Sequence, residues 1–271
     1  MRITSWNFLH GQSLSAESHD ESQRQLGAAM ADLAPDLIAL QEVDYKLPRS
    51  QSKNQMKELA NEMGAKYWAF APTLEGTPGV TWRKLNRKNQ VLVSERSEEI
   101  ELEGYGIGIV SHVPVKRWLR LELGKSLVGA PLAVANKHGK LRLMYVKDEP
   151  RVALAAVLEN GITVINVHLS FIPLFNMYQL FKVTRWAKHL EFQEKCKTIL
   201  VGDFNLIWGI PSKLTRWRRA TQALSYPSWG PKISFDYILY RDATSLSVKE
   251  IEVPPLPISD HRAITAEITL A

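Results

Sequence analysis

The sequence has few of the features that mark membrane or secreted proteins. Its 271 residues include one cysteine, Cys196, which excludes an intrachain disulfide and fits a reducing compartment. The longest apolar region, residues 161–175, is interrupted by polar residues and a proline and is too short to span a bilayer as a helix. The opening residues contain no continuous apolar segment of the kind that a signal peptide needs. We therefore expect a soluble, cytoplasmic protein.

The chain also lacks low-complexity linkers and repeats of fixed short period. Hydrophobic residues make up 45% of it and charged residues 23%, so it can bury a sizeable core and gives no sign of global disorder. We expect one compact domain over residues 1–271, and a monomer. Positive charge is in excess, and the net charge of +6 favours an anionic partner such as nucleic acid, a phosphorylated metabolite or an acidic membrane surface.

Apolar residues alternate between strand and helix spacing along the chain. Helical spacing predicts helices at 18–34, 53–63 and 175–192, and Ser18 with Glu21 has capping-box spacing at the start of the first. Residues 73–90, rich in Gly, Thr and cations, are predicted to form a long surface loop. Apolar runs predict strands at 2–9, 36–43, 66–72, 104–112, 115–123, 142–147, 151–159, 162–170, 198–203, 234–240, 247–253 and 262–270. We expect two β-sheets packed face to face with helices outside.

Polar side chains recur where the predicted strands end. The set comprises Asn7, Glu42, His168, Asp203 and Asn205, then Asp236 inside the strand 234–240 and the pair Asp260–His261 before the last strand. Each residue alone could be a turn former, a strand-end cap or an ordinary core histidine. Because ligands favour the carboxyl ends of strands in open α/β sheets, the recurrence points to a site.

Part of this set is suited to a metal ion. Glu42 and Asp260 offer carboxylates, and Asn7 or Asn205 offers an amide oxygen. These are hard oxygen donors, which suit Mg²⁺ or Mn²⁺ better than zinc.

The rest of the set is suited to proton transfer. His261 could act as a base or stabilise a developing oxyanion, and a buried Asp236 could fix its tautomer and orientation. Asp203 could align or deprotonate a water molecule. Together with a metal, these groups suit hydrolysis of a phosphate ester.

The order of the motifs that carry these residues resembles a known superfamily. The motifs are "SWN" (5–7), "LQEVD" (40–44), "VHLS" (167–170), "GDFN" (202–205), "FDYIL" (235–239) and "SDHRAI" (259–264). They resemble the endonuclease/exonuclease/phosphatase superfamily, which includes deoxyribonuclease I, exonuclease III-type AP endonucleases, neutral sphingomyelinases and inositol polyphosphate 5-phosphatases. The resemblance implies a four-layer α/β sandwich, with two packed mixed β-sheets flanked by helices. It also implies Mg²⁺-dependent phosphoester hydrolysis by in-line attack of water.

The resemblance assigns expected roles by motif position. Glu42 would be the main metal ligand, with Asn7 and Asp260 close to the metal.

The remaining motif residues would act on water and phosphate. Asp203 would orient or activate the water, and Asn205 would hold the phosphate. Asp236 would pair with His261, whose imidazole would contact the scissile phosphate, and His168 would support the phosphate or the leaving group from the other side.

Two departures from the superfamily pattern narrow the choice among its branches. His168 stands where AP endonucleases usually have tyrosine, and their tryptophan-tyrosine-arginine cluster before the "DY" strand is missing from residues 226–239. The chain therefore does not resemble a typical AP endonuclease.

Two surface features bear on the substrate. Tryptophan is interleaved with Arg and Lys at 81–88, 116–120 and 213–219. The tryptophans Trp82, Trp118 and Trp217 would either stack on the bases of a nucleic acid or pack as ordinary anchors. The apolar stretch 170–190 would either meet a membrane surface or pack as the start of a helix, and membrane contact is not favoured.

The leading hypothesis is a divalent-metal-dependent phosphodiesterase of the nuclease type, acting on a phosphate ester and using Mg²⁺ or Mn²⁺. The alternative is a phosphatase or a phospholipid, sphingomyelinase-like, phosphodiesterase. A non-catalytic binding module is disfavoured, because Glu42, Asp203, Asp236 and His261 are all present.

Overall fold

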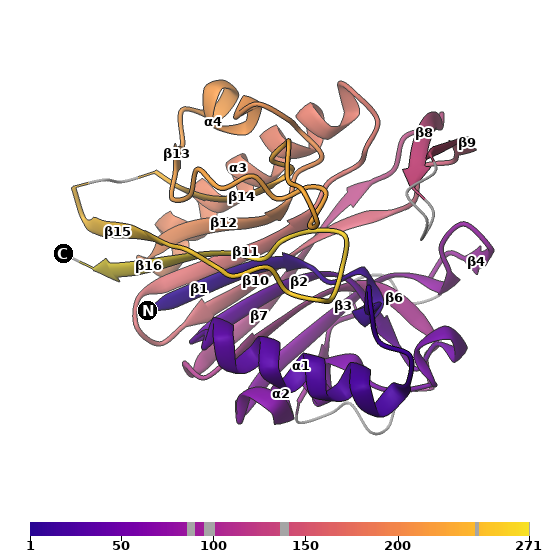
Figure 1. Cartoon of the computed structure of the whole chain (residues 1–271). Helices are drawn as coiled ribbons and strands as arrows, with labels where there is room; N and C mark the ends of the chain where they lie inside the picture. Colours follow the sequence, from indigo (N-terminus) through magenta and orange to yellow (C-terminus); the bar gives the residue numbers. More distant parts are fainter. Residues whose placement is uncertain (86–89, 95–100, 136–140, 242–243, 271) are drawn as a thin grey trace.

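Two β-sheets pack face to face, and helices cover their outer faces (Figure 1). The computed structural model describes residues 1–85, 90–94, 101–135, 141–241 and 244–270. Helices α1 (His19–Leu33) and α2 (Gln55–Met63) lie on one sheet, and α3 (Phe175–Glu194) and α4 (Ile210–Thr215) lie on the other. The expected four-layer α/β sandwich of two mixed sheets is confirmed.

The first sheet has eight strands among the described residues, in the order β15-β16-β1-β2-β6-β3-β4, with β5 beside β3. Strands β1 and β2 are parallel, whereas their outer neighbours are antiparallel to them. The strands are β1 (Arg2–Asn7), β2 (Leu37–Tyr45), β3 (Tyr67–Thr77), β4 (Thr81–Arg83), β5 (Leu92–Val93), β6 (Gly104–Ser111), β15 (Leu246–Ile251) and β16 (Ile264–Leu270).

The second sheet has six strands in the described part of the chain, in the order β13-β14-β12-β11-β10-β7. Its parallel pair is β11 and β12. The strands are β7 (Val115–Gly124), β10 (Arg151–Leu158), β11 (Ile162–His168), β12 (Lys197–Asp203), β13 (Arg218–Arg219) and β14 (Asp236–Tyr240). A separate antiparallel pair, β8 (Ala130–Ala135) and β9 (Leu141–Val146), lies between β7 and β10 in the chain. Short 3-10 turns occur at Leu9–Gly11 and Pro48–Ser50.

A buried polar bridge crosses the apolar core between the two sheets. Asn166 of β11 is fully buried, and its amide donates to the backbone oxygens of Leu40 and Gly108, each at 2.8 Å. Gln41 of β2 donates to Asn166 Oδ1 at 2.7 Å. Since a buried amide is costly when it is unpaired, this bridge favours one alignment of the sheets over others.

The start of α1 follows from a side-chain cap. Ser18 Oγ accepts a hydrogen bond from Glu21 N at 3.2 Å, and the Glu21 carboxylate accepts one from Glu17 N at 2.9 Å. The predicted N-terminal cap of α1 is thus confirmed, although the Glu21 carboxylate binds the N–H of Glu17, the residue before Ser18, and not that of Ser18 itself.

No helix in the described ranges is long and apolar enough to cross a membrane.

Two sequence expectations need correction. Residues 73–90 do not form one long loop, because β3 continues to Thr77 and pairs with β4. A side chain at Gly76 would come within 2.4 Å of Thr81 O, so glycine permits this tight hairpin. Residues 86–89 lie outside the described residues. Strand β8 was not expected at all.

Gly202 offers a test of how tightly the second sheet is assembled. Its φ is +138°, and a Cβ there would lie 1.9 Å from Val167 O on the parallel strand β11. We expect Gly202→Ala to lower the free energy of unfolding by about 3 kcal/mol, measured by chemical denaturation. Gly230→Ala is the control, because its Cβ would meet nothing within 4 Å. An equal, small effect of both changes would contradict this account.

Candidate active site

The carboxyl ends of the parallel pairs β1–β2 and β11–β12 meet at one edge of the sandwich. Asn7, the last residue of β1, joins them: its Nδ2 donates to Glu42 Oε1 at 3.0 Å and to Asp203 Oδ2 at 3.1 Å. One amide group therefore contacts a carboxylate from each sheet.

Glu42 owes its orientation to an irregularity in β2. The pairing of β2 with β6 shifts register between Leu40 and Val43, and Glu42 has a φ of +56°. A positive φ is strained for a residue with a side chain, and such strain concentrates at functional positions. The bulge turns the Glu42 carboxylate toward Asn7 instead of continuing the regular alternation of the strand.

Asp203 is the last residue of β12, and Asn205 follows two residues later. Asp203 Oδ1 accepts a hydrogen bond from Asn205 N at 2.8 Å, and Asn205 has a φ of +49°. Asn205 Nδ2 donates to Leu169 O at 2.9 Å. The turn therefore fixes the Asp203 carboxylate, while the Asn205 side-chain nitrogen is engaged with the backbone that follows β11.

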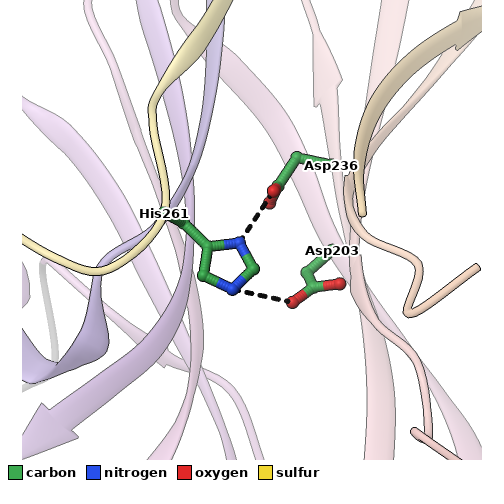
Figure 2. Close-up of side chains that lie close together, drawn as sticks. All are labelled: Asp203, Asp236 and His261. Atoms are coloured by element: carbon green, nitrogen blue, oxygen red, sulfur yellow. Dashed lines mark hydrogen bonds and ion pairs between the residues drawn. The ribbon is translucent and has the colours of Figure 1, made fainter. Parts of the chain in front are cut away.

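A histidine lies between two carboxylates (Figure 2). His261 Nδ1 is 2.8 Å from Asp236 Oδ2, and His261 Nε2 is 3.9 Å from Asp203 Oδ2. Asp236 is the first residue of β14 and lies directly opposite Asp203 in the antiparallel pairing. His168 approaches the same Asp203 oxygen, with its Nε2 at 3.7 Å. Two imidazoles thus flank one carboxylate oxygen.

The loop that carries Asp260 and His261 is fixed by contacts that sequence reasoning missed. Ser259 Oγ donates to Asn7 O at 2.6 Å and accepts from His261 N at 3.1 Å. Trp6 Nε1 donates to His261 O at 3.1 Å, and the Tyr226 ring centre lies 5.0 Å from that of His261. The only sequence signal was the position of Ser259 within "SDHRAI".

Their surroundings raise the pKa values of both Asp203 and His261. Burial, together with repulsion from Asp236, raises the pKa of Asp203 to about 7. Burial lowers the pKa of His261, but attraction to Asp236, the hydrogen bond with it, and the charges of Asp203 and Asp260 outweigh burial and raise it to about 10. His261 is therefore favoured in its protonated form.

His168 behaves in the opposite way. Burial, and then the positive charges of Arg151 and His261, lower the pKa of His168 well below its usual value. The site thus holds one neutral and one protonated imidazole on either side of Asp203.

Two carboxylates on the other side of Asn7 repel each other. Burial, followed by repulsion from Asp260, raises the pKa of Glu42, and burial is also the main cause of a raised pKa for Asp260. Asp203, Asp236 and His261 form a separate group. Among the described residues, their possible ligand atoms all lie within 4.8 Å of one another. The site therefore has two groups of carboxylates, the half-buried Glu42 and Asp260 and the buried Asp203 and Asp236.

The tryptophans of the basic stretches differ in burial. Trp217 is buried, which favours the anchor alternative for this residue, whereas Trp82 and Trp118 are half-buried. Two other tryptophans are exposed: Trp208, three residues after Asn205, and Trp229, whose neighbour Ser228 donates to Asp260 O at 2.7 Å.

Comparisons with known proteins agree with this fold. A sequence profile described as Endonuclease/Exonuclease/phosphatase family matches residues 4–261. A search of curated proteins found no match.

Several solved structures superpose on the chain at low sequence identity. An endonuclease/exonuclease/phosphatase from Beutenbergia cavernae is 18% identical, with a TM-score of 0.59 over 99% of this chain and 71% of that chain. The human Nocturnin catalytic domain with bound sulfate anion is 14% identical, with a TM-score of 0.58 over 100% and 94%. A mannosyl-6-phosphatase from Bacteroides thetaiotaomicron is 12% identical, with a TM-score of 0.57 over 100% of both chains. At these identities the likeness establishes the fold.

Glu42 provides a test of the repulsion within the site. We expect Glu42→Gln to stabilise the protein in EDTA by about 1 kcal/mol, because it removes a half-buried charge that Asp260 repels. Thermal unfolding at neutral pH measures the change, with the exposed Glu267→Gln as the control. If Glu42→Gln unfolded at a lower temperature than wild type in EDTA, the repulsion would not be the dominant effect.

Proposed function

The chain belongs to the endonuclease/exonuclease/phosphatase family, whose members hydrolyse phosphoester bonds, and from this premise we propose that it is a divalent-metal-dependent phosphodiesterase of the nuclease type. The observation that carries the proposal is the convergence of Asn7, His168 and His261 on the Asp203 carboxylate. This arrangement offers one group to handle a water molecule and two imidazoles to meet a phosphate.

The donor chemistry on the Glu42 side fits a divalent cation. Glu42 and Asp260 repel each other through a partly buried space, and such a pair is stabilised by a positive ion between or beside its members. All donors in question are oxygens, which suits Mg²⁺ or Mn²⁺, with Glu42, Asn7 and Asp260 as the proposed ligands. A bound ion would neutralise phosphate charge and stabilise the leaving oxygen.

The protein's own groups would divide the remaining work. Asp203, held by Asn7 Nδ2 and by Asn205 N, would orient a water and take its proton during in-line attack. Protonated His261, held by Asp236, would donate to a non-bridging phosphate oxygen. His168 would contact the phosphate or the leaving oxygen from the opposite side of Asp203.

Two exposed indoles favour a nucleic acid as the substrate. Trp208 is 71% exposed and lies three residues after Asn205, and Trp229 is 58% exposed and follows Ser228, whose backbone N donates to Asp260 O. Aromatic side chains beside a phosphate site can stack on unpaired bases while the backbone enters the site. The net charge of +6 adds attraction for a polyanion.

A phospholipid diesterase is the second candidate, and one observation favours it. Ile172 is buried, but Leu174, Tyr178 and Phe181 at the start of α3 are 76%, 55% and 49% exposed. They follow His168 closely in the chain and could contact lipid.

Activity measurements with variants test the reaction. We expect hydrolysis in Mg²⁺ that EDTA abolishes, and a loss of at least about a hundredfold in kcat for Asp203→Asn and for His261→Gln. The exposed His189→Gln is the control and should keep wild-type activity. Full activity in either site variant would mean that the roles assigned to Asp203 and His261 are wrong.

The same assay compares four substrates: supercoiled plasmid, bis(p-nitrophenyl) phosphate, a phosphomonoester and sphingomyelin. Activity on lipid without activity on DNA would reject the nuclease type.

The tryptophans give a separate test of the substrate. Trp208→Ala and Trp229→Ala should each raise KM for a single-stranded oligonucleotide by roughly tenfold, because each removes a stacking surface. Hydrolysis of bis(p-nitrophenyl) phosphate, which has no base, should stay unchanged. Phe192→Ala, which removes an aromatic ring that is 84% exposed near the end of α3, is the control. An unchanged KM for the oligonucleotide in both tryptophan variants would remove this support for a nucleic acid.

A further inference from the structure

Arg151, the first residue of β10, is a buried arginine with few hydrogen-bond and ion-pair partners among the described residues. It is 4% exposed, and its Nη2 lies 3.2 Å from Glu149 Oε1. Its Nε is buried and has no hydrogen-bond partner among the described residues. A buried guanidinium with an unpaired N–H group is destabilising unless something else binds it.

Other arginines of the same chain show what a structural guanidinium looks like. Arg120 has a side chain that is 3% exposed, and it donates to Glu122 Oε1 at 2.9 Å, Pro72 O at 2.6 Å and Gln90 O at 3.0 Å. Arg49 makes two hydrogen bonds to Asp44, at 2.8 and 2.7 Å. Arg151 is as deeply buried as Arg120 but has far fewer partners, so packing alone does not account for it.

The position of Arg151 connects it to the site. Strand β10 pairs antiparallel with β11, with Ala153 opposite Val167, so the start of β10 lies beside the end of β11 that carries His168. The charge of Arg151 contributes to the lowered pKa of His168, after burial. Burial disfavours the charged form of Arg151. The negative charge of Glu149, and more weakly that of Glu42, favours the charged form, and the pKa of Arg151 is raised overall. The guanidinium is thus within electrostatic reach of His168 on one sheet and Glu42 on the other.

The guanidinium is also held in advance. Asp148 accepts a hydrogen bond from Ser126 N at 2.6 Å, which ties the segment before β10 to the segment after β7. Glu149 then fixes one end of the Arg151 side chain. A side chain that is already ordered loses little entropy when it binds a ligand.

We infer that Arg151 binds the substrate phosphate, donating to a non-bridging oxygen on the His168 side of the site. This inference rests on the proposed function and adds a residue to it. Four carboxylates, Glu42, Asp203, Asp236 and Asp260, approach the region where the phosphate would lie, and each repels an anion. A planar, permanently charged guanidinium offsets part of this repulsion and supplies charge-assisted hydrogen bonds that match phosphate geometry.

Binding of inorganic phosphate to the full chain in Mg²⁺, measured by isothermal titration calorimetry, tests the inference without requiring catalysis. We expect the phosphate Kd to rise by at least about tenfold in Arg151→Met and by a smaller factor in Arg151→Lys, which keeps the charge but loses the fork of donors. Arg120→Lys is the matched control: it should lower the unfolding temperature and leave the phosphate Kd within about twofold. Circular dichroism identifies the variants that fold, and Arg151→Lys carries the test if Arg151→Met does not.

The outcomes separate the two proposals. Loss of phosphate binding in the Arg151 variants supports the inference even if wild type hydrolyses none of the tested esters, in which case only the proposed function fails. For an active enzyme, the same variants should raise KM for bis(p-nitrophenyl) phosphate. No phosphate binding by wild type, or the same Kd in wild type and the folded Arg151 variants, overturns the inference. A lower unfolding temperature with an unchanged Kd would assign Arg151 a structural role.

Discussion

The candidate site depends on the hydrogen bonds of one amide. Asn7 Nδ2 contacts Glu42 from its own sheet and Asp203 from the facing sheet, so the two halves of the site are aligned only when the sheets are packed in this one way. Below it, Asn166 and Gln41 fix the same alignment through hydrogen bonds that also cross the core. Because interiors are densely packed and resist sliding, an alignment fixed at two depths holds side chains from distant parts of the chain within hydrogen-bond distance. The geometry of the site is therefore a property of the whole sandwich.

The same edge collects features that cost stability. Glu42 and Asn205 have positive φ values, Asp236 lies opposite Asp203, and Asp236 Oδ1 and Arg151 Nε have no partner in the described structure. Such strain and unpaired charge persist only where the surroundings hold them, and here an almost wholly apolar core between the sheets does so. Unpaired buried atoms occur elsewhere in the described residues too, for example Arg219 Nε, but at this edge they belong to a carboxylate and a guanidinium, the groups that bind a cation and an anion.

Sequence reasoning recovered the architecture, and for physical reasons it grouped side chains that the structure brings together. Residues such as Asn7, Glu42 and Asp203 follow apolar strands, and the carboxyl ends of parallel strands share an edge, so local pattern was enough to group them. It missed β4 because Gly, Thr and cations are as common in a twisted exposed hairpin as in a loop. It left open whether Trp217 stacks on bases or packs as an anchor, since burial depends on tertiary contacts that composition does not carry. Arg151 was missed for the same reason: only the register of β10 against β11 brings it to His168.

The two histidines illustrate how the surroundings, and not the residue type, set chemistry. His168 and His261 approach the same Asp203 oxygen at similar distances, 3.7 and 3.9 Å, and both are buried. Burial alone would keep both neutral. His261 is nevertheless favoured as a cation because Asp236 contacts its Nδ1, whereas His168 has the positive charges of Arg151 and His261 nearby. One carboxylate thus lies near an imidazole whose protonated form is favoured and near an imidazole whose neutral form is favoured. In the reaction we propose, a phosphate bound at this edge would meet unequal partners in the two imidazoles, and that asymmetry would give the in-line attack of a water a preferred direction.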